Sequence, residues 1–368
     1  MKRVGFLWEN IVDIDTILVA MQCAAKGKTK RGDVKRVLKE KEKYAKKIQE
    51  MLVSWSFEPT PYKVASIRDG SKNKERTIYK PRYYPDQIIH WAVYLSIAPV
   101  VYRGMYEFCC GSVPKRGVHY GKKFIERWMR SDRKNTKYYL QLDITKFYPS
   151  IKIPILLEKL RRKIKDEKAL KLIEKILSQL EELPIGILLS QTFANFYLEE
   201  FDHWLKEKEK VKYYVRYMDD MLIFGANKKK LHETRKRITE RLDAIGLKLK
   251  DNWQLRRTDK EPPDIMGFRF YRTHTKLRKS LMHRMIRRIN RINHKSSLSR
   301  KDASAIISYL GWIKNSDSHW LYTERIAPYV DISYCKKVIR RASRCELNMA
   351  SSTPGRPNRR ESLEELSG

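Results

Sequence analysis

The sequence has few cysteines and no long apolar run. Its five cysteines form no CxxC pair and none of the spacings typical of a zinc site. Their odd number and loose spacing predict reduced thiols, as expected of a cytoplasmic protein. No window offers about 18 uninterrupted apolar residues, so no transmembrane helix is expected. Residues 1–8 lack the long apolar core of a signal peptide.

Acidic residues are scarce relative to basic ones. Lys and Arg number 79 against 43 Asp and Glu, which gives a formal charge of +36, and the basic residues run through the whole chain. So large an imbalance repels itself in a compact fold unless a polyanion neutralises it. Nucleic acid, held through its phosphates, is the expected partner, and a membrane is not. With eight scattered histidines, any metal is expected to be hard and bound by oxygen.

The first third of the chain changes from helical to β-like patterning. Residues 9–55 carry apolar side chains at helical spacing, with a basic, Gly-containing break at 27–32. Two β-prone runs, 62–64 and 76–79, flank a polar turn at 69–72, which predicts a hairpin. An amphipathic helix is expected after Pro85.

The rest of the chain alternates strands and helices before it becomes helical. Alternating side chains predict a strand over Tyr138 to Asp143. A helix is expected to start at about Ser190, an acceptable N-cap. Further expected elements are two helices over 154–182, a basic helix over 228–245, a β-like run at 265–270 and very basic helices over the last 90 or so residues. The tail from Ala350 is expected to be disordered.

Two adjacent carboxylates, Asp219 and Asp220, lie between the apolar runs 213–215 and 221–224. The pattern predicts a β-hairpin whose tight turn presents paired negative charge. Such carboxylates repel each other unless a cation lies between them, so a bound divalent metal is the economical explanation. The alternative is an ordinary exposed Asp-Asp turn, because Asp favours turns. Asp143 adds a third carboxylate at the end of a predicted strand. This set suits phosphoryl transfer through two Mg²⁺ ions about 4 Å apart.

The motifs around Asp143 and in Tyr217-Met218-Asp219-Asp220, in this order, resemble those of reverse transcriptases over roughly residues 60 to 325. The resemblance implies an α+β, right-hand polymerase fold, with fingers, a palm made of an antiparallel sheet with helices packed on one face, and a helical thumb. The implied divisions are an N-terminal helical extension at 1–55, fingers at 56–140, a palm at 141–275 with inserted helices at 154–182, a basic thumb at 276–348 and a disordered tail at 349–368.

The same resemblance implies an RNA-directed DNA polymerase. Its partners would be a template RNA, a DNA primer or cDNA, and dNTP substrates. Asp143 and Asp219 would be the principal ligands of two Mg²⁺ ions, for which Mn²⁺ could substitute, and Asp220 would support them. A catalytically silent RNA-binding module that retains the fold is the alternative from another class, and the three intact acidic residues argue against it.

Other roles follow from the resemblance alone. Tyr148 would lie under the nucleotide sugar and exclude a 2′-hydroxyl; the ordinary alternative is a core aromatic. Arg76, with Arg68 or Lys72, would grip the incoming triphosphate, and Lys248 or Lys250 would protonate the leaving pyrophosphate; solvated surface side chains are the alternative for all of them. Contacts to template and primer would come from Arg116, Met266, Gly267, Arg284, Arg287 and Arg288.

The run Ile185-Gly186-Ile187-Leu188-Leu189-Ser190-Gln191 is similar to the IGxxxSQ pattern of reverse transcriptases from diversity-generating retroelements. That resemblance implies error-prone copying opposite template adenines, with Gln191 near the templating nucleotide, mutagenic retrohoming and a small basic accessory protein. Two alternatives remain open. Ser190-Gln191 could be only an N-cap and a polar helix residue, and the enzyme could be a bacterial anti-phage defence reverse transcriptase with identical chemistry.

Overall fold

The computed structural model describes residues 3–69, 74–178, 180, 182–295 and 297–351. The chain forms two compact units, Met1–Thr273 and His274–Gly368. Most of the predicted polar turn at 69–72, including Lys72, and the tail at 352–368 lie outside the described residues. No helix in the described part of the chain is both long and apolar enough to cross a membrane.

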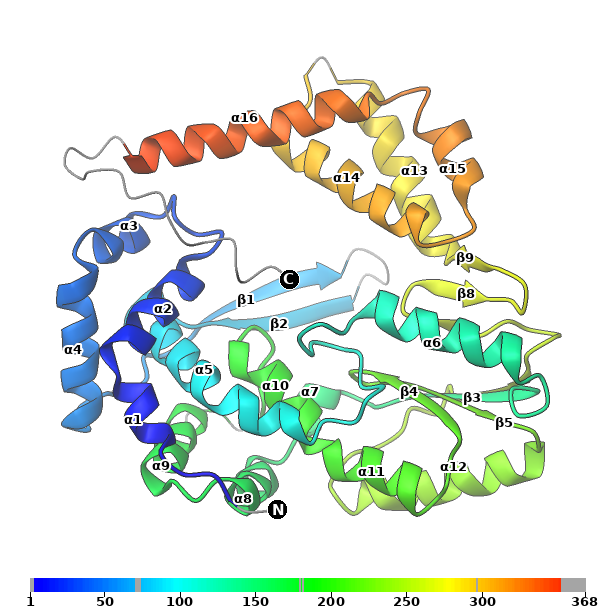
Figure 1. The fold of residues 1–368 in the computed structure, drawn as a ribbon, viewed down its shortest axis with the longest axis horizontal. Coiled ribbons are helices and arrows are strands. Elements are labelled where there is room, and N and C mark those ends of the chain that lie inside the picture. The colour runs from blue at the N-terminus through cyan, green and yellow to red at the C-terminus, as the bar shows by residue number, and fades with distance from the viewer. Residues whose placement is uncertain (1–2, 70–73, 179, 181, 296, 352–368) are drawn as a thin grey trace. The chain divides into compact units, whose positions relative to one another are not determined.

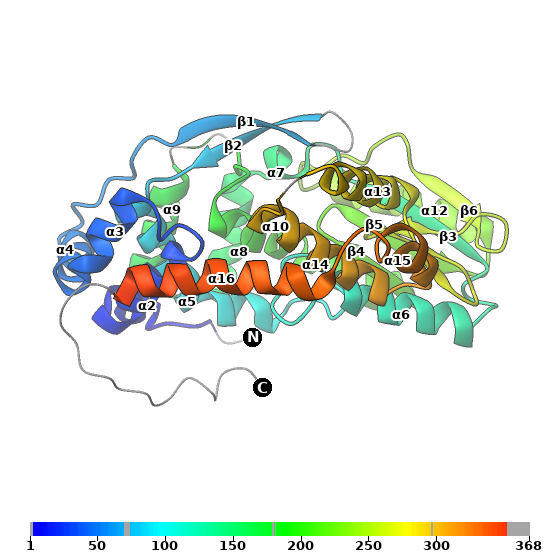
Figure 2. The ribbon, with the colours of Figure 1, turned by 90° about the horizontal axis from the view of Figure 1, so that it is seen from above.

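In the described part of the N-terminal segment there are four helices, and the first two of them pack against a fifth helix that follows later in the chain. Figures 1 and 2 show α2 lying alongside α5. The Asp13 carboxylate caps α2 by accepting a hydrogen bond from the Thr16 amide at 2.8 Å. The five are α1 (Leu7–Val12), α2 (Ile14–Ala25), α3 (Gly32–Lys39), α4 (Lys41–Val53) and α5 (Ile88–Arg103).

Helix α5 follows the short helix η1 (Tyr83–Gln87) and differs from the amphipathic helix expected after Pro85. Its side chains are buried on nearly every side because α1 and α2 cover part of it and α10 (Leu188–Tyr197) covers another part. The hairpin expected before it is confirmed as β1 (Lys63–Asp69) and β2 (Lys74–Lys80), an antiparallel pair that aligns Lys63 with Lys80.

A four-stranded antiparallel sheet forms the centre of the first unit. Its order is β4-β5-β3-β6, with β3 (Tyr138–Asp143), β4 (Tyr213–Tyr217), β5 (Asp220–Gly225) and β6 (Gln254–Arg257). Helix α12 (Lys228–Asp243) packs against β3, β5 and β6, and lies with α11 (Glu199–Glu207) on one side of the sheet (Figure 1). Helix α6 (Val118–Ser131) packs against β4, where Trp128 stacks on Tyr213 with ring centroids 5.2 Å apart.

In the described part of the chain, five helices lie between β3 and β4. They are α7 (Phe147–Ser150), α8 (Ile153–Lys163), α9 (Glu167–Leu177), α10 (Leu188–Tyr197) and α11 (Glu199–Glu207). The expected start at Ser190 is wrong, because α10 begins at Leu188 and Ser190 lies inside its first turn. The turn before this helix lies at Gly186 (φ 109°), where a Cβ would lie 2.5 Å from the Tyr79 carbonyl oxygen.

The β-like run at 265–270 is a tight hairpin and not one strand. Strands β7 (Asp264–Ile265) and β8 (Phe268–Phe270) pair antiparallel. Met266 and Gly267 form the turn with φ of 54° and 84°, and positive φ at both central residues is typical of a type I′ turn. The sequence pattern hid this turn because Met266 is apolar and buried like its strand neighbours.

The second unit confirms the expected basic helices. It contains β9 (Thr275–Leu277), α13 (Lys279–Asn293), α14 (Arg300–Lys314), α15 (His319–Arg325) and α16 (Ile332–Ser351). Helix α14 contacts the other three helices. The buried side chains of this unit include Met285, Ile289, Ile306 and Leu321.

Candidate active site

The predicted Asp-Asp hairpin is present as β4 and β5. Tyr217 and Asp220 form the last pair of the ladder, so Met218 and Asp219 are the two residues of the turn. Met218 has φ of 56°, a conformation that a residue with a long side chain rarely adopts. Holding such a residue costs about 1–3 kcal/mol, which the surrounding structure must offset.

The fold brings the predicted carboxylates together at one end of the sheet. Asp143 ends β3 directly opposite Asp220 in β5. The pKa of Asp219 is raised, first by burial and then by the negative charge of Asp143. Within the described residues, Oδ1 of Asp143 is buried and accepts no hydrogen bond.

This arrangement fits a hard cation better than a structural role. A buried carboxylate oxygen that has no donor costs free energy, and a divalent ion bound by oxygen would supply its missing partner. Among the described residues, however, no three Asp, Glu, His or Cys side chains are arranged as a metal-binding group. The donor chemistry therefore suits Mg²⁺, while the coordination expected from the sequence stays a prediction.

The segment after α12 distinguishes the two candidate lysines. The Lys250 amide donates to the Asp143 carbonyl at 2.8 Å, and the Thr145 amide donates to the Lys248 carbonyl at 2.8 Å. This register brings the Lys250 ammonium onto the Asp143 carboxylate, with which it forms an ion pair. Lys248 is exposed, so Lys250 is the lysine that the structure brings to the carboxylates.

Tyr148 and Arg76 also lie within electrostatic range of the site. Tyr148, in α7, is partly buried, and burial together with the negative charge of Asp219 raises its pKa. The positive charge of Arg76 acts on the same hydroxyl in the opposite direction. Arg76 lies on β2 opposite Ile67, and Arg68 lies on β1 opposite Glu75.

The residues predicted near the template differ in their surroundings. Gln191 is exposed in the first turn of α10. Beside it Ser190 is buried, and its hydroxyl has no hydrogen-bond partner among the described residues. Arg116 donates to the carbonyl oxygens of Tyr106 and Cys109, so its guanidinium braces a loop.

The remaining candidates lie in the β7–β8 turn and in α13. Met266 packs against α6, since a Cβ on Gly121 would lie 2.8 Å from its methyl carbon. In the second unit Arg284 and Arg287 are exposed, whereas Arg288 forms an ion pair with Asp302 at 3.0 Å. The contacts predicted for these residues with primer or template remain untested.

Sequence reasoning missed a charged group directly behind the turn. Arg216, one residue before Tyr217, is fully buried, and so is Asp202 in α11, with which it pairs at 2.6 Å. A single arginine within the β-prone run 213–217 is the feature that could have revealed it, because a buried charge in a strand requires a partner.

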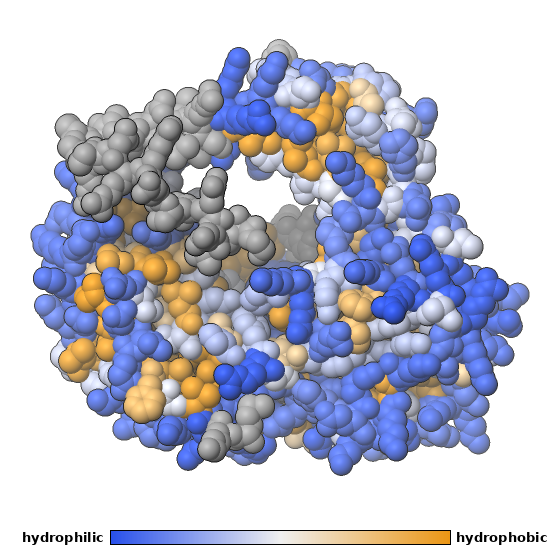
Figure 3. All heavy atoms as spheres, in the orientation of Figure 1, coloured by the Kyte–Doolittle hydropathy of each residue, from blue (hydrophilic) through white to orange (hydrophobic). Residues whose placement is uncertain are grey.

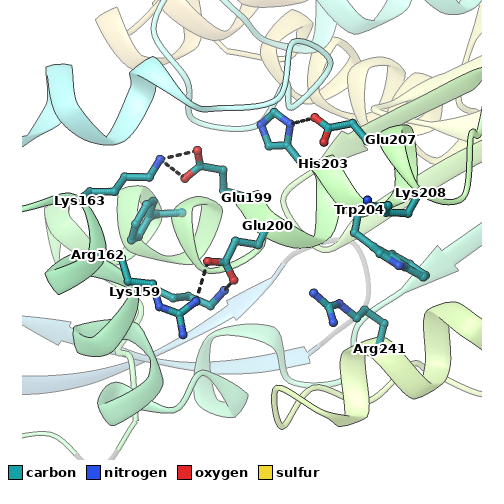
Figure 4. A pocket seen from close by; sticks show the side chains of 11 residues that line it. Lys159, Arg162, Lys163, Glu199, Glu200, His203, Trp204, Glu207, Lys208 and Arg241 are labelled. Atoms are coloured by element: carbon teal, nitrogen blue, oxygen red, sulfur yellow. Dashed lines mark hydrogen bonds and ion pairs between the residues drawn. The ribbon is translucent and has the colours of Figure 1, made fainter. Parts of the chain in front are cut away.

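A separate cavity of about 370 Å³ lies between α8, α11 and α12 (Figure 4). Most of its charged side chains are already paired, including Lys163 with Glu199 and His203 with Glu207. We interpret it as a layer of ion pairs that joins α8 to α11. Hydrophilic side chains also cover most of the visible surface over α11 and α12 (Figure 3).

Comparison with known proteins identifies the family. Protein YkfC of Escherichia coli K12 is 21% identical over 173 residues, which are 44% of this chain and 45% of that protein. A telomerase from Candida albicans, in complex with a telomeric RNA fragment, has 12% identity and a TM-score of 0.47 over 74% of this chain and 58% of its own. The apo telomerase of Candida tropicalis has 12% identity and a TM-score of 0.46, and the match covers 80% of this chain and 59% of the telomerase chain.

The chain thus spans about half to three-fifths of the length of these relatives. The family described as reverse transcriptase (RNA-dependent DNA polymerase) matches residues 39–270, well over half of the chain. Together with the carboxylates at the end of the antiparallel sheet, this match establishes that the chain belongs to the reverse transcriptase family.

Proposed function

We propose that this chain synthesises DNA on an RNA template, with Asp143 and Asp219 as the principal ligands of two Mg²⁺ ions and Asp220 as their support. The observation that carries the proposal is the register of β3 and β5, which sets Asp143 opposite Asp220 and beside the hairpin tip. Reverse transcriptases in general use divalent metals. When bound, the ions would neutralise the developing charge on the triphosphate and the attacking 3′-oxygen.

The protein's own groups would position the substrates. The Tyr148 ring would limit the space beneath the nucleotide sugar, and Arg76 would pair with the triphosphate. What supports both roles is proximity, since the charges of Asp219 and Arg76 both act on the Tyr148 hydroxyl. Lys250 is the candidate donor of a proton to the leaving pyrophosphate, since its ammonium already contacts Asp143. Residues 56–140 would form the fingers, 141–275 the palm and 276–348 the thumb.

Primer extension on a defined RNA template with dNTPs and Mg²⁺ tests the polymerase. Asp143→Asn and Asp219→Asn should each lower the rate at least about 100-fold, because each removes a carboxylate charge from the metal site. The matched control is Asp243→Asn, an exposed aspartate near the end of α12. A parent protein that extends no primer, or an Asp219→Asn variant as active as the parent, would favour the silent RNA-binding module.

We further propose that the enzyme copies template adenines with frequent errors, as part of a diversity-generating retroelement with a small basic accessory protein. The run 185–191 and the exposed position of Gln191 in the first turn of α10 support this assignment. Because the side chain is exposed, it is free to contact a nucleotide at the site.

Sequencing of the cDNA product tests the finer assignment. Gln191→Ala should reduce errors opposite template adenine and leave other errors unchanged, whereas Gln254→Ala, an exposed glutamine on β6, should change neither. An error spectrum that is not enriched at adenine in the parent would favour the alternative, a reverse transcriptase that defends a bacterium against phage.

A further inference from the structure

Arg216 is the largest fully buried side chain in the described part of the chain. Every N–H group of its guanidinium has an acceptor. Nε donates to both oxygens of Asp202 at 2.9 and 3.1 Å, and Nη2 donates to Asp202 Oδ2 at 2.6 Å. Nη1 donates to Asn195 Oδ1 at 2.9 Å, and Nη2 also points at the Asn195 carbonyl at 3.5 Å.

The remaining donor reaches the catalytic turn. Nη1 of Arg216 donates to the carbonyl oxygen of Met218 at 3.0 Å. Because the β4–β5 ladder ends at Tyr217 and Asp220, this carbonyl lies outside the ladder. The bond fixes the orientation of the peptide that joins Met218 to Asp219, at the residue whose φ of 56° needs external support.

The acceptors of Arg216 are themselves held in place. Asp202, on α11, also accepts a hydrogen bond from the Tyr214 hydroxyl at 2.8 Å. Asn195, on α10, donates to the Gly111 carbonyl at 2.6 Å. Gly111 closes the frame from the other side, since a Cβ there would lie 2.8 Å from the Met218 nitrogen. The guanidinium therefore connects α10 and α11 to the turn through a network of hydrogen bonds in which each acceptor is itself held in place.

We propose that Arg216, held by Asp202 and Asn195, is a positioning residue that sets the Met218–Asp219 peptide and thereby aims the Asp219 carboxylate at the position shared with Asp143. This inference rests on the proposed polymerase function and adds to it a group that touches neither metal nor substrate. Arg216 would act by fixing the position of the Asp219 carboxylate. This position matters because Mg²⁺ requires a nearly octahedral arrangement of its ligands.

Two variants separate positioning from folding. The double variant Arg216→Met with Asp202→Asn removes both buried charges together, so no unpaired charge is left in the interior. The amide oxygen of the new Asn side chain still accepts the hydrogen bond of the Tyr214 hydroxyl. Arg216→Lys keeps a cation for Asp202, but its donors lie on a single nitrogen and cannot reproduce the planar arrangement in which three guanidinium nitrogens reach Asp202, Asn195 and Met218. The matched control is Lys163→Met with Glu199→Gln, a mostly buried pair in the cavity of Figure 4 that does not bond the turn.

Hydrogen exchange of the segment 213–225, measured on metal-free protein, reports on the turn without any catalysis. Steady-state primer extension then gives kcat, the KM for dNTP and the Mg²⁺ concentration for half-maximal rate. We expect faster exchange in 213–225, a kcat lowered roughly 10–100-fold and a higher Mg²⁺ requirement in the double variant, with an unchanged KM for dNTP and smaller effects in Arg216→Lys.

The control pair should leave all of these quantities at the parental values. Parental exchange and parental kcat in the Arg216 variants would overturn the inference, and so would faster exchange spread evenly over the whole chain. A parent that extends no primer would defeat the proposed function alone, because exchange in the metal-free protein would still report whether Arg216 holds the turn.

Discussion

Asp143 in β3 lies directly opposite Asp220 in the antiparallel strand β5. Asp220 directly follows Asp219, which lies in the turn between β4 and β5. Two of the carboxylates thus lie on neighbouring strands and the third lies in the turn, so their separation depends on the register of one strand pair and on the conformation of one two-residue turn. A small displacement of Met218 changes the relation between Asp219 and Asp143 without unfolding the sheet.

Gly111→Ala tests how little room the turn has. A Cβ at this position would meet the Met218 nitrogen at 2.8 Å and its side chain at 2.7 Å, so the turn must shift. We expect kcat for primer extension to fall roughly 10–100-fold, because misplacement of catalytic groups by about 1 Å is sufficient for such losses. Parental kcat in Gly111→Ala would show that the turn tolerates the displacement.

Gly32→Ala is the matched control for this substitution. No atom of the described residues lies within 4 Å of a Cβ at Gly32, and its φ is not positive. This variant should keep the parental kcat and thermal unfolding midpoint, measured by circular dichroism.

Tyr148→Ala should relax the choice of sugar. Removal of the ring opens space beneath the nucleotide, so incorporation of ribonucleotides should increase relative to dNTPs in single-nucleotide extension assays. The size of the change is read from the ratio of kcat/KM for the two nucleotides. An equal loss for both would mean that Tyr148 supports packing near Asp219 and does not select the sugar.

Lys250→Met should have two opposite effects. Loss of the proton donor should lower kcat roughly 100-fold or more, as for a general acid. Loss of the ammonium that pairs with Asp143 should tighten Mn²⁺ binding to the protein without nucleic acid, measured by calorimetry. Lys248→Met should change both quantities little, since Lys248 is exposed; the reverse ranking would transfer the role to Lys248.

His90 should make stability depend on pH. It is buried in α5 with neither ring nitrogen bonded among the described residues, and burial lowers its pKa from 6.5 to about 4. The unfolded chain therefore binds a proton more readily than the folded protein, so His90 supports the fold fully above pH 6.5 and loses this contribution as the pH falls towards about 4.

Urea unfolding at pH 7.0, 5.5 and 4.0 measures the effect, from above the pKa of the unfolded chain down to about that of the folded protein. The lowered pKa corresponds to about 3 kcal/mol over that window. His90→Leu cannot take up the proton, so its free energy of unfolding should fall less than the parent's on acidification. Parallel curves for the two proteins would contradict the assignment.

The parts of the site that local patterns could predict are those formed by neighbouring residues. Alternation of side chains identified the strand that ends at Asp143, and two apolar runs around Asp219-Asp220 identified the hairpin. The frame behind the turn could not be predicted in this way. Arg216 and Asp202 meet only because α11 packs against the sheet, and no periodicity along the chain reports that contact.

The choice between Lys248 and Lys250 shows the same limit. Residues two apart in an extended segment point to the same side, so the sequence treats the two lysines alike. Only the pairing of 248–250 with 143–145 brings Lys250 to Asp143. The start of α10 was misjudged for a different reason, because Ser190 resembles an N-cap while the turn at Gly186 depends on contact with β2.

The central sheet also has a consequence for how the protein folds. Strand β3 pairs with β5 and β6, which come much later in the chain, and the helices α7 to α11 lie between β3 and β4. Loop closure over such distances is slow, because its entropy must be lost before the pairing stabilises the chain. During synthesis β3 therefore leaves the ribosome long before its partners exist, and the end of the sheet that carries Asp143 is expected to form only after β5 has been made.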